Sequence, residues 1–487
     1  MSKIVLNTVT NRIGIHVSGA RGASAADIAR RTGAVPPETT DEEYAELTLV
    51  NVRVKEAQQT GVDLVDIRGR GIKSFEPDGS EFGVIHNIRP SPYAGVQVVD
   101  ARGRAAELTG VSPIIEPLMP YVGPAIYAVE GEPSSLVLAN MLADRSRATD
   151  TVGVLLPAAG RPMEFHNQLD FDAGTLTGPV KVAVGPMRLG LLAQSGDIDI
   201  RIADNPGSGS PVILTLGDSI AYRGGMYWAN QFLTGWGYTP TWVGTLRSTG
   251  ASDESTSGGL LGEPKPGHEL GDFTHQIDGI LPLPPGDEAT YDGLSVASKR
   301  AYNTLLRAST GGDAPEDIQN GYVVDFGDYF TRHALTPATC LVLSLWTNDI
   351  NALALEDVHD RIYDGYALMI RRWRAYHATH PIVIALPGTA MAPGRDALWP
   401  AYIAATRAVW AAVNDAADPN VHLVFSGPQV TAMAGYDLTA ASAEPDAVTG
   451  GVVRTLKDAV HPTGAVRVET TRVFAATIAY ATSNIIV

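Results

Sequence analysis

Short apolar runs alternate with helical patterns from residue 212 onward. The runs are rich in Val, Ile and Leu and too short for ordinary helices, so they predict buried strands at residues 212–216, 241–244, 341–345, 382–386 and 421–425. Apolar residues at helical spacing predict helices over residues 221–232, 356–377, 400–413 and 469–480. Such alternation is typical of a mostly parallel sheet covered by helices, with its working edge at the strand C-termini. Residues 212–487 are therefore predicted to form an α/β domain.

The first 204 residues have a different pattern. Polar and apolar residues alternate at 13–17, 180–184 and 197–202, which predicts strands, whereas helix-start signals at residues 24–28, 40–47 and 134–144 are fewer. This region is predicted to be a β-rich attachment or accessory region. Residues 205–211, rich in Gly, Ser and Pro, are predicted to be a linker. Residues 245–338, rich in Gly, Pro and acidic residues, are predicted to be an insertion at the working edge.

Composition and charge limit the kinds of fold and partner that this chain can have. The chain is 45% hydrophobic and only 18% charged, which favours a large folded core. Its 53 acidic against 36 basic residues give a net charge of -17, which argues against nucleic acid or an anionic membrane as a partner. The single cysteine, Cys340, excludes an internal disulfide and a thiolate cluster, and its apolar neighbours favour a buried small hydrophobe.

The N-terminal sequence gives an expectation about location. Residues 1–7 lack a basic region followed by a long apolar core, and no run elsewhere approaches the length of a membrane span. Export by a signal peptide is therefore not expected.

A candidate nucleophile lies where the first predicted strand of the α/β domain ends, at Gly217-Asp218-Ser219. A small polar side chain at a strand-to-helix corner is exposed at the sheet edge, where helix N–H groups can stabilise a developing negative charge. These are the requirements of an acyl-transfer nucleophile. The alternative is that Asp218 or Ser219 only caps the helix.

Two further segments supply partners for a serine. His461 follows Asp458 by three residues near the C-terminus, so the carboxylate can orient a histidine base. Asn348 follows the predicted strand at 341–345, where its amide can reach an oxyanion. The alternatives are a helix cap beside a surface histidine and an Asn-Asp turn that ends a strand. His268 or His275 in the place of His461 is a further alternative.

The order of these motifs, Gly217-Asp218-Ser219, Thr347-Asn348-Asp349 and Asp458-x-x-His461-Pro462, resembles the SGNH (GDSL-type) hydrolase family over residues 212–485. The resemblance implies a flavodoxin-like three-layer α/β/α fold that needs no cofactor or metal. It also implies Ser219 as nucleophile, His461 as base and Asp458 as its orienting group. The oxyanion hole would contain Asn348 and the Ser219 N–H.

The glycine of the oxyanion hole is assigned by a second similarity. Residues 267–274, Gly-His-Glu-Leu-Gly-Asp-Phe-Thr, are similar to the Gly-His-Ser-Gly-Trp-Thr pattern of carbohydrate-esterase members, with one extra residue. This alignment selects Gly271. Trp346 stands where the family usually has a glycine, and it is predicted to form a wall of the acyl or sugar subsite; the alternative is that its side chain turns down into the core beneath the insertion. Tyr222 and Trp228 are the other predicted substrate-binding residues.

These features predict a serine esterase that removes O-acetyl groups from carbohydrate. The alternatives are a carbohydrate-binding or structural protein with an inactive hydrolase fold and a bacterial esterase or lipase of another substrate class. The β-rich leader resembles that of a phage tail or spike protein, which implies a virion or extracellular location, other virion proteins as partners and trimers, although no heptad repeat supports an oligomer. A cytoplasmic location is the alternative. A metal site at His268, Asp272 and His275 has no familiar ligand spacing.

Overall fold

The computed structural model describes residues 121–186, 192–386 except 253, 254 and 256, 396–430, and parts of 437–485. Within residues 1–120 it describes six strands. The chain forms two compact units, residues 1–115 with 185–192, and residues 116–184 with 193–487. The first unit contains the antiparallel pairs β1 (Ser2–Asn7) with β2 (Arg12–Val17), β3 (Lys73–Phe75) with β4 (Glu81–Val84), and β5 (Ile88–Pro90) with β6 (Val96–Val98). The helices predicted near residues 24–28 and 40–47 lie outside the described residues.

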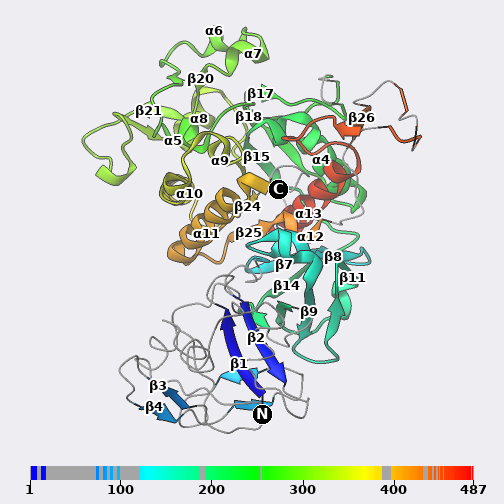
Figure 1. Ribbon diagram of the computed structural model, residues 1–487. Coiled ribbons are helices and arrows are strands. Elements are labelled where there is room, and N and C mark those ends of the chain that lie inside the picture. The colour runs from blue at the N-terminus through cyan, green and yellow to red at the C-terminus, as the bar shows by residue number, and fades with distance from the viewer. Residues whose placement is uncertain are drawn as a thin grey trace. The chain divides into compact units, whose positions relative to one another are not determined.

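A central sheet organises the second unit (Figure 1). Its strands are β15 (Val212–Gly217), β16 (Thr241–Val243), β17 (Leu246–Arg247), β18 (Leu261–Pro264), β23 (Cys340–Ser344), β24 (Ile382–Leu386) and β25 (Val421–Phe425). The order is β17-β18-β15-β23-β24-β25, with β16 also paired to β15, and every pairing except β17 with β18 is parallel. From β18 to β25 this is the flavodoxin-like order, in which the switch point lies between β15 and β23.

Helices cover both faces of the sheet, and successive residues of each strand point alternately to one face and to the other. Leu214 and Leu343 lie in the core shared with α10 (Leu355–Tyr376) and α11 (Trp399–Ala416). Ile213 and Cys340 lie in the core shared with α4 (Met226–Gly235) and α13 (Gly464–Thr482). Burial raises the pKa of the Cys340 thiol, as expected for a small core hydrophobe. Among the described residues, no helix combines the length and apolar character needed to cross a bilayer.

A layer of short strands precedes the sheet in the chain. β7 (Ala125–Val129) pairs in parallel with β14 (Asp199–Ala203), and its side chains join the core beneath α13. The other strands are β8 (Ser134–Val137), β9 (Thr151–Pro157), β10 (Met163–Phe165), β11 (Gln168–Phe171), β12 (Val180–Pro186) and β13 (Ala193–Gln194). The helix predicted at 134–144 was wrong. Residues 134–137 pair with β11 and residues 138–141 form a 3₁₀ turn, because strand pairing overrides the local helical signal.

The linker predicted at residues 205–211 packs against the body of the unit, so the compact unit does not divide there. The Gly207 N–H donates to the Trp236 carbonyl at 2.7 Å, and the Thr239 N–H donates to the Gly209 carbonyl at 2.9 Å. A Cβ atom at Gly207 would lie 2.2 Å from the Tyr238 ring. The glycines that suggested flexibility are therefore needed for close packing, and residues 116–184 and 193–204 belong with the α/β sheet.

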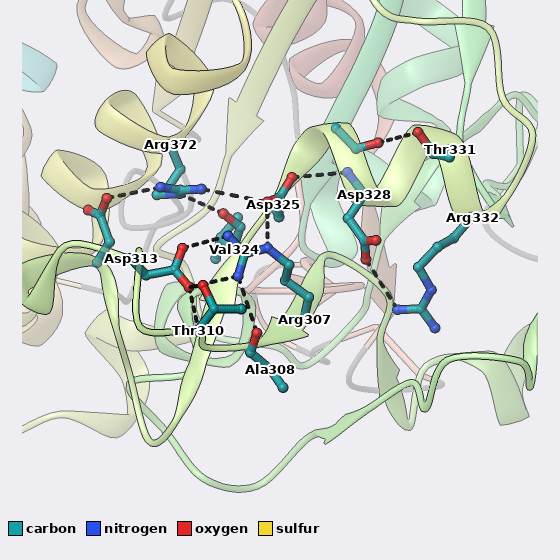
Figure 2. Close-up of polar contacts among 12 residues, drawn as sticks. Arg307, Ala308, Thr310, Asp313, Val324, Asp325, Asp328, Thr331, Arg332 and Arg372 are labelled. Atoms are coloured by element: carbon teal, nitrogen blue, oxygen red, sulfur yellow. Dashed lines mark hydrogen bonds and ion pairs between the residues drawn. The ribbon is translucent and has the colours of Figure 1, made fainter.

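The insertion at residues 245–338 is folded and tied to α10 by ion pairs. Figure 2 shows Arg307 between two carboxylates, with donor–acceptor distances of 2.6 Å to both Asp313 and Asp325. Arg372 of α10 donates to the Val324 carbonyl at 2.7 Å. The elements of the insertion include α5 (Leu270–Thr274), β19 (Leu281–Pro282), α6 (Glu288–Asp292), α7 (Val296–Lys299), β20 (Tyr302–Asn303), β21 (Leu306–Ala308), β22 (Tyr322–Val324) and α8 (Phe326–Arg332).

Candidate active site

Ser219 lies at a tight corner where β15 ends. A Cβ atom at Gly217 would lie 2.4 Å from Ala221 Cβ, so only glycine allows the chain to turn this closely. Asp218 Oδ1 accepts the Ile220 N–H at 2.8 Å and fixes the turn. An irregular helical turn, Ala221–Gly225, precedes α4. The predicted strand-to-helix corner is therefore present, and it holds the serine at the switch point of the sheet.

The structure brings together the three residues predicted for nucleophilic catalysis. His461 Nε2 lies 2.8 Å from Ser219 Oγ, and His461 Nδ1 lies 2.7 Å from Asp458 Oδ2. Both distances are within hydrogen-bond range, and the two ring nitrogens face different partners. If Nδ1 donates to the carboxylate, Nε2 is left as the acceptor for the serine proton. The arrangement has the geometry of an acyl-transfer triad.

The carboxylate of this triad is fixed in its ionised form. Burial alone would raise the pKa of Asp458, but hydrogen bonds from the His461 backbone and ring and from the Val460 N–H lower it to about 2. Asp458 Oδ1 accepts the Val460 N–H at 2.9 Å and the His461 N–H at 3.0 Å, which leaves Oδ2 for the imidazole. The short Asp-x-x-His spacing thus folds into a turn that orients the base.

Arg223 is a further member of the site, and nothing in the sequence marks it. Its Nη1 lies 3.2 Å from both Asp458 Oδ2 and His461 Nδ1. Arg223 has non-helical backbone angles within the irregular turn, and this conformation places it beside the C-terminal loop. The guanidinium therefore shares the Asp458 carboxylate with His461.

Two of the predicted oxyanion residues, Asn348 and Gly271, lie on segments that are hydrogen-bonded to each other. Asn348 begins α9 (Asp349–Ala352), and its Nδ2 donates to the His268 carbonyl at 2.8 Å. The Leu270 N–H donates to the Asp349 carboxylate at 3.1 Å. Gly271 follows Leu270 in the first turn of α5. These bonds hold the segment that contains Gly271 against the Asn348 turn, but its role in the oxyanion hole stays a prediction.

A buried ion pair supports the segment that carries His268. The side chain of Lys265 is 1% exposed and that of Glu263 is fully buried, with 3.7 Å between Nζ and Oε2. Tyr329 donates to Glu263 Oε1 at 2.7 Å, and Lys265 Nζ donates to the Tyr302 carbonyl at 2.7 Å. The Lys265 N–H also donates to the Gly217 carbonyl at 2.8 Å. The pair therefore connects the nucleophile strand with the loop beside Asn348.

Two buried carboxyl groups flank the site without touching the triad. Burial raises the pKa of Asp218 to about 6 and that of Asp349 to about 7, although each accepts backbone N–H bonds that oppose the shift. Each fixes a turn, Asp218 through Ile220 and Asp349 through Leu270. Both are structural groups of the two motifs, and their neutral forms carry a smaller desolvation cost.

The alternative roles considered for His268 and His275 find no support. His268 Nε2 lies 2.9 Å from the Arg300 carbonyl, and Asp272 accepts the Glu269 N–H in a capping box. His275 Nε2 faces Asp278 at 3.8 Å, and burial lowers the pKa of its ring. The three residues of the considered metal site thus have separate partners. In the described part of the chain, no group of three or more acidic, His or Cys side chains could hold a metal.

The predicted substrate-binding aromatics divide into two groups. Trp346 is fully buried, with its ring centroid 5.0 Å from that of Tyr402, so it belongs to the core and does not form an open wall. Its φ of +129° differs from that of an ordinary strand end. Trp228 lies half-buried on α4 with its ring edge-on to Tyr227. The Tyr222 ring, by contrast, lies against Arg300 of the insertion.

No protein-family model matches the sequence, and no curated protein matches it. The solved structures that are similar to the chain include two carbohydrate esterases. One is a carbohydrate esterase family 2 enzyme with a carbohydrate-binding domain from Corynascus thermopiles (Myceliophthora fergusii), 14% identical, with a TM-score of 0.25 and coverage of 74% of this chain and 98% of that one. The other is a carbohydrate acetylesterase from Xanthomonas citri, 12% identical, with a TM-score of 0.19 and coverage of 63% and 68%.

Proposed function

We propose that the protein is a serine esterase and that its substrate is an O-acetylated carbohydrate. The observation that carries the reaction class is the hydrogen-bonded series from Ser219 through His461 to Asp458, with distances of 2.8 Å and 2.7 Å. A helix cap beside a surface histidine would not require these three side chains to align. The alignment joins segments that are more than 200 residues apart in the chain.

The proposed reaction follows from the roles of these groups. His461 Nε2 takes the proton of Ser219 as Oγ attacks the acyl carbon, and Asp458 stabilises the imidazolium that forms. The Ser219 N–H, Asn348 Nδ2 and Gly271 N–H would stabilise the oxyanion. His461 then gives its proton to the departing sugar hydroxyl. Water then attacks the acyl carbon as His461 takes its proton, and His461 gives that proton to Ser219 Oγ as the bond from Oγ to the acyl carbon breaks and acetic acid leaves.

The proposed substrate class rests on separate grounds. The segment at residues 267–274 is similar to a carbohydrate-esterase pattern, and its loop contacts Asn348 through the His268 carbonyl. Tyr222 and Trp228 lie on the segment that follows Ser219, and we propose that they contribute aromatic surface to the sugar site, Trp228 directly and Tyr222 together with the Arg300 that lies over its ring. A place in a virion, with other virion proteins as partners, stays a prediction from the β-rich leader.

Acetate release from an acetylated polysaccharide tests the proposal, alongside hydrolysis of p-nitrophenyl acetate. Ser219→Ala should abolish both activities, whereas Ser208→Ala, at an exposed serine outside the site, should leave both unchanged. Equal turnover by wild type and Ser219→Ala would refute the nucleophile. Binding of the polysaccharide without any ester hydrolysis would favour the alternative of a carbohydrate-binding protein with an inactive hydrolase fold.

A further inference from the structure

Arg300 of the insertion lies beside the candidate active site. It follows α7, and its guanidinium carbon is 4.4 Å from the centroid of the Tyr222 ring. Its Nε is buried and has no hydrogen-bond acceptor. Stacking of this kind holds the guanidinium plane and leaves the N–H groups at its edge for an acceptor.

Two series of contacts connect Arg300 to the catalytic residues. Tyr222 is the third residue after Ser219, and its N–H donates to the Asp218 carbonyl at 3.1 Å. On the other side, His268 Nε2 lies 2.9 Å from the Arg300 carbonyl, and Asn348 Nδ2 donates to the His268 carbonyl at 2.8 Å. Arg300 is thus held by both the segment that follows the nucleophile and the loop beside the oxyanion asparagine.

Unlike Arg307 and Arg332 of the insertion, Arg300 has no acidic partner among the described residues, and unlike Arg247, which donates to the Gly259 carbonyl at 2.6 Å, it leaves a buried Nε without an acceptor. Arg307 is bonded to Asp313 and Asp325, and Arg332 is bonded to Glu288 at 2.5 Å (Figure 2 shows the Arg307 network). Among the residues that the structure describes, no carboxylate forms an ion pair with Arg300. In a chain with 53 acidic and 36 basic residues, an arginine that stays unpaired at the active site is available for an anionic ligand.

We propose that Arg300 binds a carboxylate of the glycan, so that the substrate is an O-acetylated polysaccharide that contains uronic acid. This inference rests on the proposed esterase function. A carboxylate matches the two-pronged donor edge of a guanidinium and carries a single charge, which one arginine can balance. Sulfate and phosphate esters share the oxyanion chemistry. A doubly charged phosphate ester would favour more than one cation, and a tetrahedral sulfate ester matches the planar fork less well than the two oxygens of a carboxylate, so the carboxylate fits this subsite best.

The test compares two acetylated substrates, O-acetylated polygalacturonate and neutral acetylated xylan. Arg300→Gln should raise KM for the acidic polymer about 10- to 100-fold, the range of one lost charge-assisted hydrogen bond. KM for the xylan and turnover of p-nitrophenyl acetate should not change. Arg300→Lys should recover only part of the affinity, because an ammonium keeps the charge but not the forked geometry. Arg247→Gln, which removes an exposed arginine of the same insertion, should leave both values of KM unchanged.

Competition experiments identify the anion. Galacturonate oligomers should inhibit wild type and lose their effect in Arg300→Gln, whereas neutral galactose oligomers should not inhibit. Stronger inhibition by inorganic sulfate or phosphate than by galacturonate would overturn the carboxylate assignment. An equal loss on both acetylated polymers in Arg300→Gln would overturn the subsite. A wild-type protein without Ser219-dependent hydrolysis of p-nitrophenyl acetate would instead overturn the proposed function itself.

Discussion

Replacement of Trp346 by glycine and by alanine should separate a core role from a substrate-binding role. The indole is fully buried, and loss of a large aromatic side chain from a core typically costs about 3–5 kcal/mol. The backbone φ of Trp346, +129°, also affects stability, because a residue with a side chain is strained by about 1–3 kcal/mol at this φ and glycine is not. Glycine is also more flexible than alanine in the unfolded chain, which lowers the stability of the glycine variant by about 0.4–1 kcal/mol. Trp346→Gly should therefore be less stable than wild type but more stable than Trp346→Ala by about 1 kcal/mol.

Chemical denaturation of the three proteins measures these differences. The ratio of acetyl to butyryl ester hydrolysis, measured on folded protein, reports on the acyl pocket. A core indole predicts that this ratio changes little in either variant. A glycine variant as stable as wild type that hydrolyses butyryl esters relatively faster would show that the indole lines the pocket, as predicted from the sequence. A glycine variant less stable than the alanine variant would contradict the strain at this position.

Three further predictions concern the motifs around Ser219. Asn348→Ala should lower kcat about 10²- to 10³-fold with a smaller change in KM, measured on p-nitrophenyl acetate, if its amide donates to the oxyanion. Asp458→Asn should lower kcat about 10³- to 10⁴-fold. Because the pKa of Asp458 is about 2, the fall of the wild-type rate in acid should follow protonation of His461 alone. A second fall in rate near pH 4 would contradict this expectation. Burial raises the pKa of Asp349 from 3.8 to about 7, so the folded state holds a proton that the unfolded state releases, and wild-type stability should fall as pH rises from about 4 to 7. Asp349→Asn should remove roughly 4 kcal/mol of this fall. A variant whose free energy of unfolding decreases between pH 4.5 and 7.5 as much as that of wild type would contradict the raised pKa of Asp349.

The sequence was sufficient for the elements whose signal is local. Buried parallel strands are continuous apolar runs, and all five of the predicted runs overlap strands, namely β15, β16, β23, β24 and β25. The helix predicted at 356–377 corresponds to α10 within one residue at each end, because its apolar residues recur on one face. The residues of the triad also lie in short motifs, each at or near the end of an element.

Tertiary structure decided the features that depend on residues distant in the chain. A Gly-Ser-Pro composition at 205–211 suits either a linker or close packing, and the contacts of Gly207 with Trp236 and Tyr238 selected packing. Trp346 follows an apolar strand at the working edge, and this position suits either a wall of the subsite or a core residue. The direction of its side chain depends on α11, where Tyr402 contacts its ring. The partners of Arg223 and Arg300 likewise come from other segments. Local pattern thus determined which elements form and which residues can carry chemistry, whereas packing between distant segments determined which side chains meet, because that packing depends on the whole fold.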